Sequence, residues 1–291
     1  MIMLGAIIGD MVGSVYEWEN TSSLSFPIPD RKEHVTDDSV MTCAIASALL
    51  ESDMSKTCPD NLEKIRKKVI DEMRRWYLIF PNAGYGRSFL SWLKGENGYL
   101  PYGSYGNGAG MRISPVGWLA TSEENLFAFA ECCTDITHDH EEGIKGAEAI
   151  ALGVFLSLHG RKKEEIRKRL LFFYSELADI DLLLEKGRKQ GFDFSCQGTV
   201  PLAIAAFLKA EDEEETIRLA VSLGGDSDTI ACMAGSLAEA YWQKDSVSGI
   251  ERLLWPSIPE KIREVLLLFH GKDRKGKILS EIEPSKKPSG I

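Results

Sequence analysis

This sequence has no long apolar run, no strand-like alternation and no dividing linker. No apolar stretch approaches the ~20 residues that span a bilayer, and residues 1–8 lack the basic leader of a signal peptide. Alternation with a period of two never persists, and β-branched residues are scattered along the chain. Neither a hydrophilic linker nor a repeat period is visible. We therefore expect one domain without a sheet and without a membrane partner.

Basic residues are fewer than acidic residues. Lys plus Arg number 34 against 44 Asp plus Glu, which gives a net charge of -10. A surface of that sign repels phosphate backbones, so a nucleic acid is not expected as the main partner. The basic stretch that does occur lies at the end of the chain. We interpret it as a loosely ordered, solvated tail, residues 272–291, that follows a domain of residues 1–271.

Paired cysteines are missing as well. The chain has six cysteines, none of them in a C-x-x-C pair and most of them among apolar neighbours. This pattern is typical of reduced, packed thiols and not of a disulfide framework. It predicts a cytoplasmic protein.

Helical patterns occupy most of the chain. Residues 62–80 and 258–269 carry apolar side chains at steps of three and four, which predicts amphipathic helices laid against a core. Residues 38–50, 143–158 and 228–242 are apolar on nearly every side, which predicts central, buried helices. Prolines and glycines fall between these segments. The fold class that we predict is all-α.

Two short acidic segments, Thr36-Asp37-Asp38-Ser39 and Gly224-Gly225-Asp226-Ser227-Asp228-Thr229, stand out chemically. Each precedes a predicted buried helix, so both could be helix caps, which favour Asp, Ser and Thr. One acid per helix start satisfies that need, and each segment has two. If the two turns met, each pair of carboxylates ~4 Å apart would repel by about 4 kcal/mol at an effective dielectric near 20, and cations would be needed. Composition leaves capping and metal binding equally open, and an all-oxygen set favours Mg²⁺, Mn²⁺ or Ca²⁺ over zinc.

A further acid, Glu17, follows the first predicted helix segment. Asp10, Ser14 and Glu17 are three or four residues apart, so we expect them to share one face of a helix. Gly13 leaves room on that face for close approach. Taken alone, Glu17 would be an exposed surface charge; beside the acidic turns, it could join them.

Five short segments rich in glycine or in polar side chains follow one another along the chain. They are Gly9-Asp10-x-x-Gly13-Ser14-x-x-Glu17, Thr36-Asp37-Asp38, Gly106-Asn107-Gly108-Ala109-Gly110-Met111-Arg112, Thr137-His138 and Gly224-Gly225-Asp226-Ser227-Asp228-Thr229. Their order and spacing resemble the ADP-ribosylglycohydrolase family, the group of the dinitrogenase-reductase-activating glycohydrolase and the eukaryotic ADP-ribosyl-acceptor hydrolases. One acidic turn alone would be a weak signal, whereas five segments in this order are specific. The resemblance extends over residues 4–245.

The resemblance implies a single-domain orthogonal bundle of helices with a binuclear Mg²⁺ or Mn²⁺ centre. Carried over by position, the metal ligands would be Thr36, Asp37, Asp38, Asp226, Asp228 and Thr229. Glu17 would be a mobile ligand or acid/base group, and Glu17 and Asp37 would move the proton. The ADP-ribose would be held by Gly106, Asn107, Gly108, Ala109, Gly110, Met111, Arg112 and His138. Backbone N–H groups of a glycine-rich turn that leads into a helix form an anion cradle, although composition alone favours an ordinary flexible connection.

Three features depart from these motifs or lie beside them. Ala109 stands where the family often has Ser, which would remove one hydroxyl contact to a phosphate. His138 is followed by an acidic continuation, residues 139–142, which bears on substrate identity more than on reaction type. Residues 195–201 could line the pocket or start a helix, and Cys196 shows no sign of the paired histidine that a nucleophile needs.

The expected function is that of a metal-dependent hydrolase that cleaves the glycosidic bond between ADP-ribose and an acceptor. The acceptor would be a protein arginine or serine, or a small ADP-ribosylated compound. Three alternatives stay open: a module that binds ADP-ribose without cleaving it, a glycohydrolase of another nucleoside or phosphorylated sugar, and a structural helical protein whose acids are caps. The distance between the two acidic turns decides whether the metal interpretation can stand.

Overall fold

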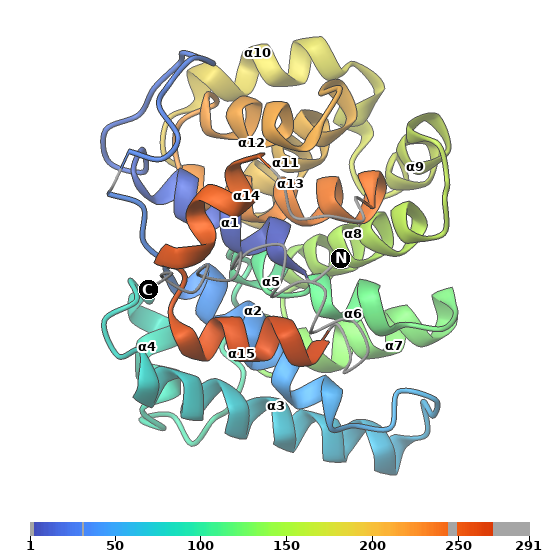
Figure 1. The fold of residues 1–291 in the computed structure, drawn as a ribbon. Helices are drawn as coiled ribbons and strands as arrows, with labels where there is room; N and C mark the ends of the chain where they lie inside the picture. Colours follow the sequence, from blue (N-terminus) through green and yellow to red (C-terminus); the bar gives the residue numbers. More distant parts are fainter. Residues whose placement is uncertain (1–2, 31, 244–248, 270–291) are drawn as a thin grey trace, which may run out of the picture.

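The computed structural model describes residues 3–30, 32–243 and 249–269, and over these ranges the chain folds into packed helices joined by loops (Figure 1). The all-α prediction is confirmed. None of the described helices combines the length and the apolar character that crossing a bilayer requires. The predicted tail, residues 272–291, and the domain boundary before it lie outside the described residues.

Loops separate the helices, the longest of them being residues 15–36 and 94–107. The β-structure among the described residues amounts to an isolated bridge between Gly106 and Ser195. In Figure 1, α10 and α12 lie at the top of the view and α3 lies at the bottom. In chain order the elements are α1 (Leu4–Ser14), α2 (Asp37–Leu50), α3 (Pro59–Ile79), α4 (Arg87–Leu93), α5 (Gly108–Met111), α6 (Ser114–Leu119), α7 (Glu123–Thr134), α8 (Glu141–Leu158), α9 (Lys163–Leu170), η1 (Ser175–Ala178), α10 (Ile180–Gln190), α11 (Cys196–Lys209), α12 (Glu213–Val221), α13 (Ser227–Trp242), α14 (Gly249–Leu254), η2 (Trp255–Ser257) and α15 (Glu260–Phe269).

Helix α1 is the centre of the fold. All 11 of its residues are buried, and its most extensive contact is with α13. Gly5, Gly9 and Gly13 follow at intervals of four and form one face of the helix. A Cβ on Gly9 would overlap the carbonyl of Ala231, and a Cβ on Gly13 would overlap the backbone of Asp228. The two helix backbones therefore touch directly, and their crossing brings the end of α1 beside the start of α13.

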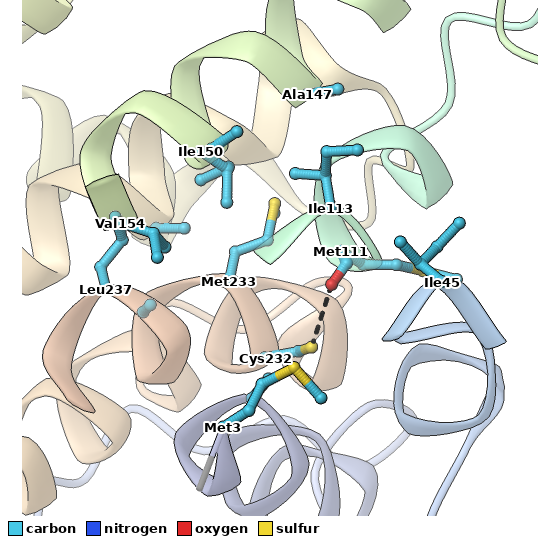
Figure 2. Packing of buried hydrophobic residues seen from close by; sticks show 14 of the residues in the cluster. Met3, Ile45, Met111, Ile113, Ala147, Ile150, Val154, Cys232, Met233 and Leu237 are labelled. Atoms are coloured by element: carbon cyan, nitrogen blue, oxygen red, sulfur yellow. Dashed lines mark hydrogen bonds between the residues drawn. The ribbon is translucent and has the colours of Figure 1, made fainter. Parts of the chain in front are cut away.

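Helix α8 covers the other side of α13 (Figure 2). Met233 of α13 points toward Ile150 of α8, and the thiol of Cys232 donates to the carbonyl of Met111 at 3.5 Å. All six cysteines are free, which agrees with the predicted reduced thiols. Two of the three segments predicted as central helices, α8 and α13, are thus packed against each other in the core.

Several helix boundaries differ from the sequence prediction by a few residues, and the differences at α3 and α1 have clear physical reasons. Helix α3 begins at Pro59, earlier than the predicted residue 62, because proline fits the first helical position. Helix α1 ends at Ser14, so the prediction that Glu17 shares a helical face with Asp10 is wrong. Glu17 lies in the loop that follows, and its position depends on contacts made by that loop.

Replacing Gly9 with alanine is expected to lower the free energy of unfolding by about 1–3 kcal/mol or more. The added methyl group would meet backbone atoms of α13, which cannot move aside as a flexible side chain can. The measurement is urea unfolding followed by circular dichroism. Gly86→Ala is the matched control, because Gly86 has an ordinary φ of -58° and open space around the Cβ position. Equal destabilisation by both substitutions would contradict the direct contact.

Candidate active site

The first acidic turn opens α2. Thr36 is the N-cap, and its hydroxyl accepts a hydrogen bond from the N–H of Asp38 at 3.3 Å. The predicted capping is therefore present, but it uses the threonine and not the carboxylates. Asp38 is nevertheless 2% exposed, and Asp37 lines a large cavity. Asp38 is thus buried and Asp37 is half-buried at the cavity, and neither carboxylate is the cap.

Asp10 of α1 fixes this turn. Its carboxylate accepts hydrogen bonds from the N–H and the hydroxyl of Thr36, at 2.9 and 2.8 Å. It also accepts from the N–H of Ser39 at 3.1 Å and from the Ser39 hydroxyl. Four donors on one carboxylate join α1 to the start of α2. The sequence analysis included Asp10 in a motif but assigned it no function. The feature that could have revealed its importance is a single carboxylate within an apolar, glycine-rich helix.

The second acidic turn opens α13. Gly224 and Gly225 have φ values of 72° and 67°, which favour glycine, and they turn the chain into the helix. Asp228 lies in the first helical turn. The hydroxyl of Thr229 donates to Asp38 Oδ2 at 3.2 Å. The two acidic turns therefore meet inside the core.

Five carboxylates gather where the turns meet. Oxygen atoms of Asp10, Asp38 and Asp228 lie within 4.8 Å of one another, and so do oxygen atoms of Glu17, Asp226 and Asp228. Asp228 belongs to both sets, so the two clusters share one residue. Both groups of oxygens could hold divalent cations, and Asp228 lies within reach of each group.

Burial and mutual repulsion disfavour charge on these acids. Burial raises the pKa of Asp38 and of Asp228 well above the ordinary range, and neighbouring carboxylates add to the shift. Burial, helped by the charges of Asp10 and Asp226, raises the pKa of Asp37 to about 8. Within the described structure, Asp38 Oδ1 and Asp228 Oδ1 are buried and have no hydrogen-bond partner. Unpartnered oxygens in a cluster of like charges fit a divalent cation such as Mg²⁺ or Mn²⁺.

Glu17 reaches the cluster from the loop after α1. Nδ2 of Asn20 donates to the carbonyls of Tyr16 and Glu17, at 2.6 and 3.0 Å, while its Oδ1 accepts from the N–H of Gly225 at 3.0 Å. The side chain of Asn20 therefore ties the Glu17 segment to the second acidic turn. Burial, then the charge of Asp226, raises the pKa of Glu17.

The carboxylates border a cavity of about 790 Å³, a size that suits a nucleotide-like ligand. The predicted site residues that line it are Glu17, Thr36, Asp37, Asp38, Gly106, Asn107, Gly108, Met111, Arg112, His138, Asp226, Asp228 and Thr229. Ala109 and Gly110 do not line it: Ala109 is fully buried, and Gly110 packs against Met233 and Val200. The departure at Ala109 therefore leaves the lining of the cavity unchanged.

Asn107 connects the glycine segment to the acidic centre. Its Nδ2 donates to Asp226 Oδ2 at 2.7 Å, and its N–H donates to the carbonyl of Phe194 at 2.7 Å. The helix that follows, α5, is four residues long. An anion held here would rely on individual N–H groups of the loop more than on the dipole of a long helix.

The residues after His138 build a loop and a helix start. Asp139 accepts a hydrogen bond from the N–H of Gly103 at 2.6 Å. His140 is the N-cap of α8, whose first turn contains the two glutamates of the acidic continuation. None of these four residues lines the described cavity. The continuation shapes the wall of the site and does not present its charge to a ligand.

Residues 195–201 begin a helix. The hydroxyl of Ser195 caps α11 by accepting the N–H of Gly198 at 3.1 Å. The sulfur of Cys196 donates to the carbonyl of Gly106 at 3.2 Å, and burial raises the pKa of this thiol to about 12. A thiol that stays protonated at neutral pH is a poor nucleophile. The helix-start interpretation is therefore the one that the structure supports.

The fold and the site together define an all-helical protein with a buried carboxylate centre beside a glycine-walled cavity. Known proteins resemble this chain in sequence and in fold. The ADP-ribosylglycohydrolase family matches residues 1–267. The chain therefore belongs to the ADP-ribosylglycohydrolase family, and it is a glycosidic-bond hydrolase by class.

Individual relatives are distant but cover most of the chain. ADP-ribosylhydrolase ARH3 of Homo sapiens is 27% identical over 318 aligned residues, covering 84% of this chain and 85% of that protein. ADP-ribosylarginine hydrolase Tri1 of Pseudomonas putida (strain GB-1) is 24% identical over 298 residues, covering 91% of this chain and 76% of that protein. A solved structure described as an ADP-ribosylglycohydrolase-related protein complex superposes with a TM-score of 0.64 at 25% sequence identity, covering 94% of this chain and 93% of that chain.

The carboxylate cluster gives a test by pH. A folded-state pKa of about 8 for Asp37, above its ordinary value of 3.8, favours folding at low pH, and this contribution is lost as the pH rises through 8. In a chelator, the contribution of Asp37 to the free energy of unfolding is therefore expected to fall from about pH 4 to about pH 8 and to level off above that. Because ions bind the deprotonated acids, the stabilisation given by Mg²⁺ should grow over the same range. Urea unfolding with chelator and with Mg²⁺ measures both. Equal stability with and without divalent ions at pH 9 would contradict the assignment.

Proposed function

We propose that this chain hydrolyses the bond between the anomeric carbon of an ADP-ribosyl group and its acceptor, with the help of two Mg²⁺ or Mn²⁺ ions. The observation that carries the proposal is the meeting of the two acidic turns. It leaves buried, unpartnered oxygens of Asp38 and Asp228 beside a cavity large enough for ADP-ribose. Membership of the ADP-ribosylglycohydrolase family supplies the substrate class.

Six residues would hold the ions. Each of them lines the cavity, and each offers oxygen donors, the kind that Mg²⁺ and Mn²⁺ prefer. When bound, the ions supply a more acidic water and a grip on the ribose hydroxyls. The proposed ligands are Thr36, Asp37, Asp38, Asp226, Asp228 and Thr229.

Glu17 and Asp37 are the proposed proton-transfer groups. Both line the cavity, and the pKa of each is raised by burial and by nearby carboxylates. A carboxyl group that titrates closer to neutral pH can take a proton from water and return it to a leaving acceptor. The other carboxylates would stabilise the positive charge that develops on the ribose in an oxocarbenium-like transition state.

The glycine segment and His138 would hold the rest of the ADP-ribosyl group. Gly106, Asn107 and Gly108 line the cavity with backbone N–H groups that suit a diphosphate. Ala109 and Gly110 would contribute by letting this segment pack closely against the core, since neither lines the cavity. A cytoplasmic location and the lack of a nucleic-acid partner remain predictions from composition.

The acceptor is best determined by release of product. Metal-stripped protein is incubated with ADP-ribosylated arginine and serine peptides, Mg²⁺ or Mn²⁺ is added back, and free ADP-ribose is followed. We expect release from at least one peptide and only after a metal is added. Tight retention of ADP-ribose without release would favour the binding module, and turnover of another nucleoside or phosphorylated sugar alone would favour the other glycohydrolase.

Asp228→Asn is expected to reduce turnover by at least a hundredfold and to weaken metal binding, because Asp228 belongs to both carboxylate clusters. Isothermal titration with Mn²⁺ measures metal binding directly. Circular dichroism should show that the variant keeps nearly all of its helical content. Asp71→Asn is the matched control, because the Asp71 side chain is 74% exposed on α3. Wild-type turnover in the Asp228 variant would refute the assignment of the site.

A further inference from the structure

Three buried polar side chains form a chain of contacts behind the glycine segment. Arg112 and Thr137 are 0% exposed and His138 is 4% exposed. Nη2 of Arg112 donates to Thr137 Oγ1 at 2.7 Å, and Thr137 Oγ1 lies 2.7 Å from His138 Nδ1. The guanidinium is closed to solvent although Arg112 borders the cavity, and the hydrogen bond that it donates leads to Thr137 and from there to His138.

The contacts determine which ring nitrogen of His138 carries the proton. Arg112 can only donate, so Thr137 Oγ1 accepts from it and keeps its own proton to give to His138 Nδ1. Nη2 of Arg112 also lies 3.5 Å from the same Nδ1, where a second proton would be repelled. Nδ1 is thus the acceptor nitrogen, and a neutral imidazole with an accepting Nδ1 has its proton on Nε2.

Nε2 of His138 faces the glycine segment. It lies 3.2 Å from the position that a Cβ on Gly108 would occupy and 3.6 Å from that position on Gly106. These two glycines therefore leave open the path from Nε2 to the cavity, which His138 also lines. Side chains at these positions would stand between the imidazole and a ligand.

The buried guanidinium also forms no ion pair with an acid among the described residues. Arg112 Nε and Nη1 have no hydrogen-bond partner among the described residues, and one face of the group lies 5.5 Å from the ring of Phe89. Burial lowers the pKa of Arg112 to about 10, so the group remains a cation at neutral pH. Burial, and then the charge of Arg112, lowers the pKa of His138 well below its ordinary value, so the imidazole is neutral. A buried cation without an acid is stabilised by an anion placed nearby.

We propose that Arg112 and Thr137 are positioning residues that fix His138 as an Nε2–H donor toward the diphosphate of the ADP-ribosyl substrate. This inference rests on the proposed function for the identity of the anion. It assigns Arg112 an indirect role, since its side chain donates to Thr137 and not into the cavity. His138 supplies the hydrogen bond, and the enclosed guanidinium supplies the positive potential behind it.

The tautomer is measured first, in the protein without ligand. Long-range ¹H–¹⁵N correlation spectra of histidine-labelled protein distinguish Nδ1–H from Nε2–H imidazoles. The chain has five histidines, so His138→Gln identifies the resonance of interest by its loss. We expect a neutral Nε2–H ring for His138 in the wild type and a mixture of tautomers in Thr137→Val. An Nδ1–H ring in the wild type would overturn the proposal.

Binding of ADP-ribose by isothermal titration is measured next. Thr137→Val should weaken binding about tenfold, the effect of losing one correctly directed hydrogen bond, whereas Thr137→Ser should retain most of the affinity. His138→Gln, whose amide can donate from near the Nε2 position, should bind better than His138→Asn. Thr134→Val is the matched control, because Thr134 is 0% exposed at the end of α7 and its hydroxyl has no partner among the described residues.

The outcomes separate this inference from the proposed function. Unchanged affinity and an unchanged tautomer in Thr137→Val would overturn the role of the chain of contacts. If the wild type failed to bind ADP-ribose, the proposed function would be contradicted. The tautomer spectra, recorded without ligand, would still decide whether Arg112 and Thr137 fix the proton of His138.

Discussion

Direct backbone contact between α1 and α13 sets the position of every group in the site. Gly13 lies against Asp228, and its carbonyl accepts the hydroxyl of Ser227 at 3.0 Å, so the start of α13 is fixed to the end of α1. Asp10 lies one turn earlier on α1 and holds the start of α2 through Thr36. One helix crossing thus brings together acids that lie about 190 residues apart in the chain, and the absence of side chains on one face of α1 makes it possible.

The carboxylates are of two kinds, which differ in the number of hydrogen-bond donors that surround them. Asp10 accepts four hydrogen bonds, which satisfy it within the protein. Asp38 and Asp228 each keep one buried oxygen without a partner. Leaving such oxygens unpaired among like charges is unfavourable in the protein alone. Asp38 and Asp228 are therefore the acids that suit a divalent cation, while Asp10 belongs to the framework that holds them.

The sequence predicted several of the long helices but only part of the site. Residues 143–158 and 228–242 are apolar on nearly every side, and such segments form buried helices whatever their partners. Glu17 was misplaced because helical periodicity does not say where a helix ends; here the Asn20 side chain, bound to Gly225, shapes the loop. The direction of Ala109 and the link from Arg112 to His138 depend on how loops pack, which spacing along the chain does not encode. Asp10 was visible in the motif, but its partners were not.

Groups of opposite charge lie around the cavity. Carboxylates line it, and the buried guanidinium of Arg112 lies behind Gly108 of the glycine segment. Asn107 links the two, because its side chain donates to Asp226 and its backbone belongs to the glycine segment. An ADP-ribosyl group has the same polarity: its diphosphate is anionic, and its anomeric carbon becomes positive as the bond breaks. A protein of net charge -10 can therefore accept an anionic substrate in one orientation, with the reacting carbon beside the acids.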